Sequence, residues 1–275
     1  MKVKMKMGFR YKRLLGYVLG FVLFYAPFAL FQKIIFFIFT GTWQQLTIHS
    51  LCLRIQTEHL FDGKLLTMSG PFMACLVILL AVTLFLGPVF CGRLCPAGAF
   101  TEYLSKIMPA KLQISWRTYT EIAPLRYGML AGFVILPFFD SLLACAYCNF
   151  FLFDLFVNYF VFGYFISLTS SMILTLFLWA GLFGIFTKGG RGFCNFLCPV
   201  GAVQNLLYSF SRRLPFVYKL KIDSQKCIGC QKCVQTCPME AMTMHNNKAA
   251  SCVHNCILCG ACMAECPEQA IRYER

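Results

Sequence analysis

The sequence predicts an α-helical membrane protein with about four transmembrane helices in two pseudo-repeated halves, followed by a small α+β domain. Three observations predict this class: 59% of the 275 residues are hydrophobic, only 13% are charged, and the cysteines near the C-terminus form regular runs. A soluble fold of this size cannot hide so much apolar surface, because many residues of any globule face water. The composition also excludes a disordered or collagen-like chain.

The first half of the chain predicts two membrane spans. Six basic residues lie within positions 1–13, and the long apolar run at 14–39 follows them. This run is too long for a signal peptide and has no small-residue cleavage site, so we expect an uncleaved span with a cytoplasmic N-terminus. The polar segment 42–66 predicts an outer loop, and 68–90 predicts a second span of about the twenty residues that a bilayer needs.

The second half predicts a third span at 125–144 and is ambiguous over 141–187. One span at 165–186 gives four in total and leaves both termini in the cytoplasm, whereas two spans there would give five. We favour four, with 145–162 as a re-entrant or interfacial aromatic helix. The net charge of +14 then suits cytoplasmic loops of a protein in the inner membrane and does not indicate nucleic-acid binding.

A cysteine motif recurs in the membrane part. Cys91-Gly-Arg-Leu-Cys95-Pro-Ala-Gly-Ala is followed, in the second half, by Cys194-Asn-Phe-Leu-Cys198-Pro-Val-Gly-Ala. Each copy follows a predicted span at its cytoplasmic end. The four thiols could complete one further iron–sulfur centre at the membrane face, form two redox-active dithiols, bind copper through soft sulfur ligands, or serve as structural turns.

After residue 215 the composition changes, so we divide the chain into a membrane domain, 1–215, and a C-terminal domain, 216–275. Two complete C-x₂-C-x₂-C-x₃-C-P runs start at Cys227 and Cys256. Such runs place three thiolates on one [4Fe–4S] cluster and the fourth on its neighbour. The first predicted ligand set is Cys227, Cys230, Cys233 and Cys266; the second is Cys256, Cys259, Cys262 and Cys237. Cys252 is not needed as a ligand.

Weaker signals lie elsewhere. Cys145 and Cys148 are either a redox centre deeper in the membrane or two buried thiols, and Asn149 excludes a c-type haem, which needs histidine there. His49, like His59, is a candidate for binding a quinone headgroup, although loop histidines are commonly just solvated. The stretch that begins Lys188-Gly-Gly predicts a flexible hinge.

The paired Cys-x-x-x-Cys-Pro motifs and the double ferredoxin run together resemble the NapH-type membrane ferredoxins, over about residues 11–271. Membrane parts of NosR-type proteins and of cytochrome oxidase maturation ferredoxins share the pairs. The resemblance implies a two-[4Fe–4S] ferredoxin domain and an electron-transfer subunit of a membrane redox complex. Such a subunit passes electrons between a quinol or cytoplasmic donor and a partner reductase.

The sequence contains no arrangement of residues for substrate chemistry, so turnover should depend on partner subunits. Two alternatives remain open. One is a maturation or metal-reducing protein whose membrane thiols handle copper, and the other is a redox-sensing membrane protein.

Overall fold

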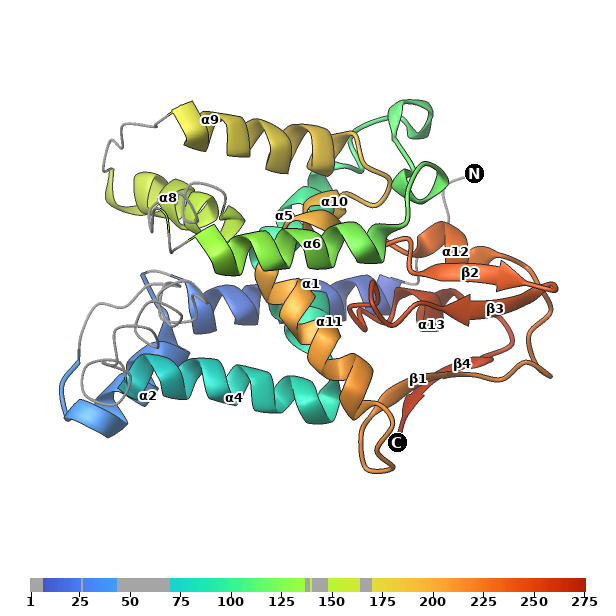
Figure 1. Cartoon of the computed structure of the whole chain (residues 1–275), viewed down its shortest axis with the longest axis horizontal. Coiled ribbons are helices and arrows are strands. Elements are labelled where there is room, and N and C mark those ends of the chain that lie inside the picture. The colour runs from blue at the N-terminus through green and yellow to red at the C-terminus, as the bar shows by residue number, and fades with distance from the viewer. Residues whose placement is uncertain (1–6, 26, 44–69, 137–138, 140–147, 164–169) are drawn as a thin grey trace.

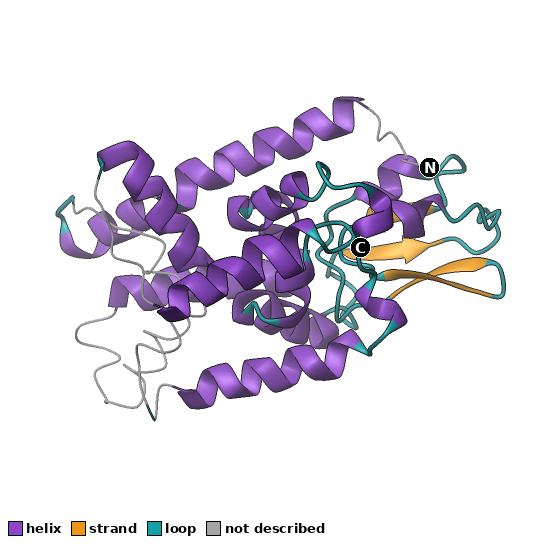
Figure 2. Cartoon of the chain, turned by 90° about the horizontal axis from the view of Figure 1, so that it is seen from above, coloured by secondary structure: helices purple, strands orange, loops and turns teal. Residues whose placement is uncertain are grey.

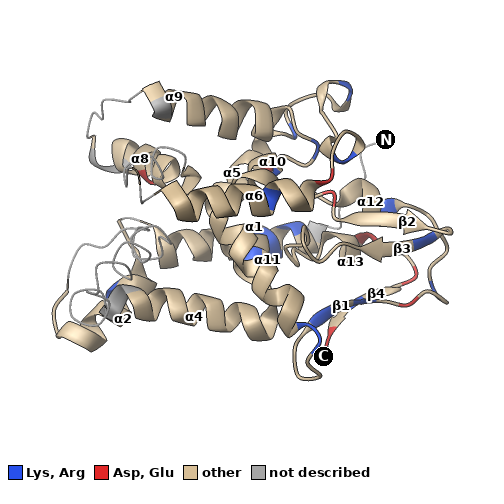
Figure 3. Cartoon of the chain, viewed as in Figure 1, with Lys and Arg blue, Asp and Glu red and all other residues tan. Residues whose placement is uncertain are grey.

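A bundle of helices is joined at one end to a small domain of strands and short helices (Figures 1 and 2). The computed structural model describes residues 7–25, 27–43, 70–136, 139, 148–163 and 170–275. Charged residues are concentrated toward the end that carries the strands (Figure 3). The apolar helices occupy most of the opposite end.

Apolar sequence forms the main helices of the bundle, and proline and glycine set several of their ends. The main helices are α1 (Met7–Phe24), α2 (Leu30–Thr40), α4 (Gly70–Leu86), α6 (Ile122–Ile135), α8 (Asn149–Phe162) and α9 (Ser170–Leu176), which continues into the π-helical segment η6 (Phe177–Ile185). α4 packs against α2. α4 ends at Leu86, and the following Gly87 adopts a left-handed φ of 72° that favours glycine.

The predicted first span is broken into two helices. Proline disfavours helical backbone in the residue before it and lacks an N–H group, and α1 ends shortly before Pro27. Ala29 is left-handed at the start of α2, and the Gln32 side chain donates a hydrogen bond of 2.9 Å to the Phe24 carbonyl. The two helices therefore pack together as a pair in place of one continuous rod.

The four predicted spans are not supported in the form we expected. Across the described ranges, the structure holds no helix that combines the length and the apolar character needed to cross a membrane. The predicted aromatic helix at 145–162 has its counterpart in α8.

The two cysteine motifs adopt similar local structures. In the first, the turn η2 (Phe90–Leu94) leads to Cys95, which caps α5 (Pro96–Leu104). In the second, α10 (Gly192–Phe196) leads to Cys198, which caps α11 (Pro199–Ser211). Proline suits the first position of both helices because its missing N–H would have no helical partner there. Two 3₁₀ turns, η3 (Ala110–Leu112) and η4 (Trp116–Thr118), lie in the connection from α5 to α6.

The C-terminal domain consists of two antiparallel strand pairs and two short helices. β1 (Lys219–Ile222) pairs with β4 (Ile271–Glu274), so that Lys219 faces Glu274 across the ladder. β2 (Met242–His245) pairs with β3 (Lys248–Ser251) through a tight two-residue turn, Asn246-Asn247, with both residues at positive φ. The helices α12 (Lys232–Thr236) and α13 (Ala261–Glu265) pack against each other.

The bundle and the C-terminal domain share one buried core. Phe24, Cys91 and Trp179 from the bundle belong to the same apolar cluster as Met239 and Ile257 from the C-terminal domain. Hydrogen bonds cross the interface as well: the buried Asn195 amide donates to the Met239 carbonyl at 3.1 Å, and the Asn205 amide donates to the Cys256 carbonyl at 3.0 Å. The predicted boundary at 215/216 lies in the connection between α11 and β1.

Candidate iron–sulfur sites

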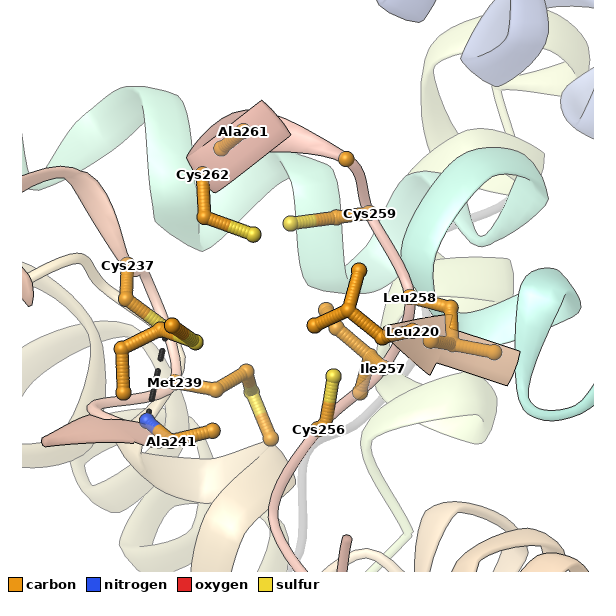
Figure 4. Close-up of a pocket in the computed structure, with 12 residues that line it drawn as sticks. Leu220, Cys237, Met239, Ala241, Cys256, Ile257, Leu258, Cys259, Ala261 and Cys262 are labelled. Carbon is orange, nitrogen blue, oxygen red and sulfur yellow. Dashed lines mark hydrogen bonds between the residues drawn. The ribbon is translucent and has the colours of Figure 1, made fainter. Parts of the chain in front are cut away.

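The C-terminal domain contains an inner cavity surrounded by four cysteines. The space in it that is open to the centre of a water molecule is about 20 Å³. The four sulfurs point toward its centre from different sides (Figure 4). They belong to Cys237, Cys256, Cys259 and Cys262. The structure thus brings together the four residues that the spacing assigns to the second cluster, including the thiol that crosses from the first run.

An outer cavity of the same size, about 20 Å³, lies in the other half of the domain. Its lining comes entirely from residues 226–271 and includes Cys227, Cys230, Cys233 and Cys266. This is the ligand set expected for the first cluster. Cys230 is exposed, and the neighbouring Ile228 is 65% exposed, so this cavity lies close to solvent.

The two halves of the C-terminal domain have matching backbone conformations, which orient the cysteines toward the cavities. Gln231 and Gly260 are both left-handed immediately before α12 and α13. Cys237 and Cys266 end these helices with extended backbone, which turns each thiol toward the opposite cavity. The N–H of Ala241 donates to Cys237 Sγ and the N–H of Ala270 donates to Cys266 Sγ, both at 3.3 Å. Donors of this kind stabilise charge on a cluster's sulfur ligands.

The cavities fit a polynuclear cluster. Within the described residues, no three cysteine, histidine or carboxylate side chains come close enough together to hold a single metal ion. Instead, the cysteines surround the inner and outer cavities. Burial raises the pKa of Cys256 to about 12 and that of Cys237 to about 11, so these thiols hold their protons until a metal displaces them. Cys252 does not line either cavity.

The structure also brings the two Cys-x-x-x-Cys-Pro pairs together. Cys91, Cys95 and Cys198 are buried in one core cluster, and Cys194 packs against it. A Cβ placed on Gly98 of the first motif would lie 3.3 Å from Cys194 Sγ of the second. Burial and the nearby Cys194 together raise the pKa of Cys95 to about 12. Four thiols from two half-motifs therefore share one environment, which the repeat predicted.

Two buried arginines flank these thiols, and each lies over the glycine of one motif. A Cβ on Gly98 would lie 2.7 Å from Arg191 Nη1, and a Cβ on Gly201 would lie 2.7 Å from Arg126 Nη2. The recurring glycine thus leaves room for a guanidinium in each half. Arg126 donates to the His254 carbonyl at 2.7 Å, but its Nε and Nη2 are buried without a partner among the described residues.

A third buried arginine and one carboxylate complete the group. Glu102 pairs with Arg13 at 2.9 Å and with Arg191 at 2.8 Å. Arg191 also donates to the Cys91 carbonyl at 2.8 Å. Burial alone would raise the pKa of Glu102, but Arg191 and Arg13 together hold it below its ordinary value.

Arg126, which lies near these thiols, is a buried charge that the described residues do not fully pair. Arg13 and Arg191 share Glu102, whereas two nitrogen atoms of Arg126 have no hydrogen-bond partner among the described residues, and buried charges are costly unless they are paired. An anionic occupant would provide the missing partner. A cluster with four thiolate ligands is such an anion, so the donor set and its surroundings fit a third iron–sulfur centre.

The sequence alone did not predict the buried charged residues around these thiols, which are Arg13, Glu102, Arg126 and Arg191. The usable signal was Arg126, which is an isolated charge inside a predicted span, since ionisable residues in apolar segments commonly mark functional sites. No local sequence pattern predicts that Glu102 contacts Arg13 and Arg191. Their partners lie 89 residues or more apart in the chain.

Other predicted site residues are placed only in part. Cys148 precedes α8 and packs against the core cluster that contains Cys91. Cys145, His49 and His59 lie outside the described residues. The stretch expected to be a hinge is tightly packed: a Cβ on Gly189 would lie 2.5 Å from Pro238 Cα, and one on Gly190 would lie 2.4 Å from the Thr101 carbonyl. Both glycines have positive φ, so they serve as a close-packed turn.

Comparison with known protein families identifies iron–sulfur domains in both parts of the chain. Residues 69–115 and 171–216 each match the family described as "4Fe-4S binding domain", and residues 219–267 match the "4Fe-4S dicluster domain". The chain is thus a [4Fe–4S] protein that combines a repeated domain with a two-cluster domain.

Among curated proteins, the chain is similar to relatives with electron-transfer names. It is 25% identical over 191 residues to the "Putative electron transport protein YccM" of Escherichia coli, covering 65% of this chain and 49% of YccM. It is 29% identical over 188 residues to the "Methylamine utilization ferredoxin-type protein MauN" of Methylobacillus flagellatus, covering 67% of this chain and 59% of MauN. The chain therefore spans half to three-fifths of these two proteins.

These relatives support iron–sulfur electron transfer as the general function, while the NapH-type assignment stays a prediction. No solved structure matches the chain. It is 30% identical over 192 residues to MJ0750, an uncharacterized protein of Methanocaldococcus jannaschii, covering 67% of this chain and 72% of the relative. By this relationship the chain belongs to the same family as MJ0750, and it carries 4Fe-4S binding domains in both its helical and its C-terminal parts.

Proposed function

We propose that this chain is a membrane-bound electron-transfer subunit that holds three [4Fe–4S] sites in series. The outer site is held by Cys227, Cys230, Cys233 and Cys266, and the inner site by Cys237, Cys256, Cys259 and Cys262. The third is held by Cys91, Cys95, Cys194 and Cys198. When bound, each cluster supplies a one-electron redox group. The protein's own residues determine where these groups stand and what surrounds them.

The contact between Gly92 and the inner ligand loop carries this proposal. Gly92 follows Cys91 of the third site, and a Cβ on Gly92 would lie 2.9 Å from the Cys259 nitrogen. Arg93 Nε donates to the Leu258 carbonyl at 3.3 Å. The ligand loops of the inner and third sites therefore touch through backbone, whereas the outer site faces solvent. This order suits a relay between a soluble partner at the outer site and a partner at the bundle.

The third site is supported by the repeated domain, because each copy of the domain supplies only part of a four-cysteine ligand set. Each of the matched segments, 69–115 and 171–216, contains only one cysteine pair of the motif. A four-cysteine site therefore requires both copies, and the bundle places both copies in one buried environment. The unpaired buried charge of Arg126 favours an anionic cluster over four neutral thiols.

We further propose that the bundle resides in the inner membrane with the ferredoxin domain on the cytoplasmic side. The outward faces of α1 and α2 support this, because large apolar side chains are exposed there, among them Leu15, Leu19, Phe37 and Ile38. Reporter fusions after Lys111, Lys188 and Arg275 should then read cytoplasmic, and a fusion after Lys64 should read external. An external reading at Arg275 would contradict this placement.

The donor and acceptor belong to the same proposal: a quinol or cytoplasmic donor on one side, and the redox enzyme of a membrane complex on the other. The names of YccM and MauN support a redox partner of this kind. Purification of the native complex with identification of its subunits would test it. Recovery of the chain alone, with clusters that quinol does not reduce, would favour a redox sensor instead.

Metal analysis of the anaerobically purified chain tests the clusters themselves. Iron and acid-labile sulfide should each approach about twelve per chain, against about eight if only the C-terminal domain is loaded. Cys230→Ser should remove one cubane EPR signal, and Cys252→Ser is the matched control because Cys252 lines neither cavity. Copper in place of the last four irons would favour the metal-handling alternative.

A further inference from the structure

A basic cavity of about 570 Å³ lies between the bundle and the ferredoxin domain. Its walls come from α1, the segment after α5, the turn at Lys188 and the C-terminal end of α12. Arg10, Lys106 and Lys188 line it from three different elements, and Cys237 contributes to its wall. A volume of this size lies within the range of about 300–1,000 Å³ that is usual for small-molecule sites.

The charge of this cavity is not balanced by the protein. Its one acidic wall residue is Glu102, which is already paired with Arg13 and Arg191. None of the cavity's three cations forms an ion pair within the part of the chain that the structure describes. Arg10 and Lys106 are exposed on their outer sides, and Lys188 is half-buried. Partial burial lowers the pKa of Lys106, and so do Arg13 and Arg10, against the opposing effect of Glu102. A positive potential therefore remains for an incoming anion.

Close packing gives the cavity its shape without a ligand. The turn at Gly189 contacts Pro238 of the ferredoxin domain, where no Cβ would fit. On another wall, the Gln113 amide donates to the Ser105 carbonyl at 2.6 Å. Lys106 Nζ lies 4.0 Å from the centre of the Tyr103 ring, so its ammonium group is already held in place. Preorganised cations of this kind lose little freedom on binding an anion.

We propose that this cavity binds a phosphate group, carried either by a small molecule or by the headgroup of an anionic lipid, and that its occupancy tunes the adjacent inner cluster. The uncompensated cations favour an anion over a neutral quinone ring. The second half of the proposal rests on the proposed function. Cys237 belongs both to the wall of this cavity and to the inner ligand set. An anion in the cavity therefore repels the extra electron of the reduced inner cluster and lowers the reduction potential of that cluster.

The test uses the full chain, purified in detergent with its clusters. Inorganic phosphate is titrated by calorimetry at low ionic strength, where charge interactions are least screened. The double variant Lys106→Gln/Lys188→Gln should weaken binding by about tenfold or more. Lys111→Gln is the matched control, because Lys111 is exposed and lies outside the cavity.

Nanodiscs of two lipid compositions distinguish a lipid headgroup from a free phosphate compound as the occupant. In nanodiscs that contain phosphatidylglycerol, loss of phosphate binding relative to phosphatidylcholine nanodiscs identifies a lipid headgroup as the occupant. Equal binding in both identifies a free phosphate compound. Either result supports the site. Binding that is absent in wild type, unchanged in the double variant, or equally weakened by Lys111→Gln would overturn it.

An EPR-monitored redox titration tests the tuning. Saturating phosphate should lower the midpoint potential of the inner cluster in wild type and in Lys111→Gln, and should leave it unchanged in the double variant. An unchanged wild-type potential at full phosphate occupancy would refute the tuning. A chain that binds phosphate but holds no clusters would refute the proposed function and leave the anion site standing.

Discussion

Gly92 of the bundle and Ile257 of the ferredoxin domain are packed backbone to backbone. A Cβ on Gly92 would lie 2.0 Å from the Ile257 carbonyl oxygen, a distance at which one of the two segments must move. Gly92 follows Cys91, and Ile257 follows Cys256, so the contact joins the ligand loops of two proposed sites. Glycine at this position allows the closest approach that a polypeptide chain can make.

Gly92→Ala should therefore separate the two domains without removing any ligand. We expect electron transfer from the ferredoxin clusters to the bundle to slow, and the chain to lose about 1–3 kcal/mol of stability through overpacking. Freeze-quench EPR after rapid reduction measures the first effect, and thermal unfolding measures the second. Gly128→Ala is the control, because a Cβ there meets no atom within 4 Å. Wild-type transfer rates in Gly92→Ala would show that the contact does not matter.

Cys95→Ser and Cys198→Ser should abolish the same spectroscopic species. Each residue caps one of the two equivalent helices, α5 and α11, and a four-ligand site needs both motifs. Iron should fall by about four atoms per chain in either variant, while the two ferredoxin signals persist. EPR and iron analysis of both variants measure this. If the two substitutions remove different species, or neither removes one, the pairs are separate dithiols or structural turns.

Arg126→Met should lower the midpoint potential of the third site. The buried guanidinium lies near Cys91, Cys194 and Cys198, and two of its nitrogen atoms have no hydrogen-bond partner among the described residues, so its charge is available to stabilise a reduced, more negative cluster. A shift on the order of 60 mV corresponds to a tenfold change in a one-electron equilibrium. Redox titration measures it, and Arg126→Lys should retain part of the wild-type potential. A potential that rises in Arg126→Met would exclude this role.

Glu102→Gln should destabilise the chain at neutral pH by about 3–5 kcal/mol, because it leaves Arg13 and Arg191 buried without their anion. The pKa of Glu102 is lowered in the folded chain, so its stabilisation is complete above the ordinary carboxyl pKa and is lost as the pH falls through the lower folded value. Stability measured against pH should therefore converge for the two proteins in acid.

Glu274→Gln is the matched control for Glu102→Gln. Glu274 pairs with Lys221 at 3.3 Å, and both side chains are nearly half exposed. Solvent screens such a pair, so its loss should cost no more than about 1 kcal/mol. Equal effects of the two substitutions would mean that the buried group around Glu102 is not specially stabilising.

The eight ferredoxin ligands could be predicted from the sequence because cluster ligation depends on local spacing. A run such as the one that starts at Cys227 sets its thiols by short turns, and the proline after Cys237 lets the fourth thiol cross to the other cavity. The cavity linings reproduce both sets. The convergence of Cys91 and Cys194 could likewise be expected, since equivalent ends of two repeated halves tend to meet.

The sequence also indicated helices along the apolar segments, but it misjudged their continuity. Hydropathy averages over a window and does not register that one residue, Pro27, interrupts the first predicted span. The same limit applies to the turn at Gly189, where two adjacent glycines suggested flexibility. Their positive φ values and the close approach of Pro238 show a fixed turn, which depends on a neighbour from another domain.

The sequence by itself thus indicated which cysteines are the cluster ligands. The tertiary structure decided which residues surround them. The pairing of Glu102 with Arg13 and Arg191 joins three distant segments, and the choice of which ferredoxin cavity faces the bundle depends on how Gly92 meets Ile257. Ligand spacing is a property of a few consecutive residues, so it can be read locally. Charge compensation and domain docking depend on residues far apart in the chain, and only the folded chain brings those residues into contact.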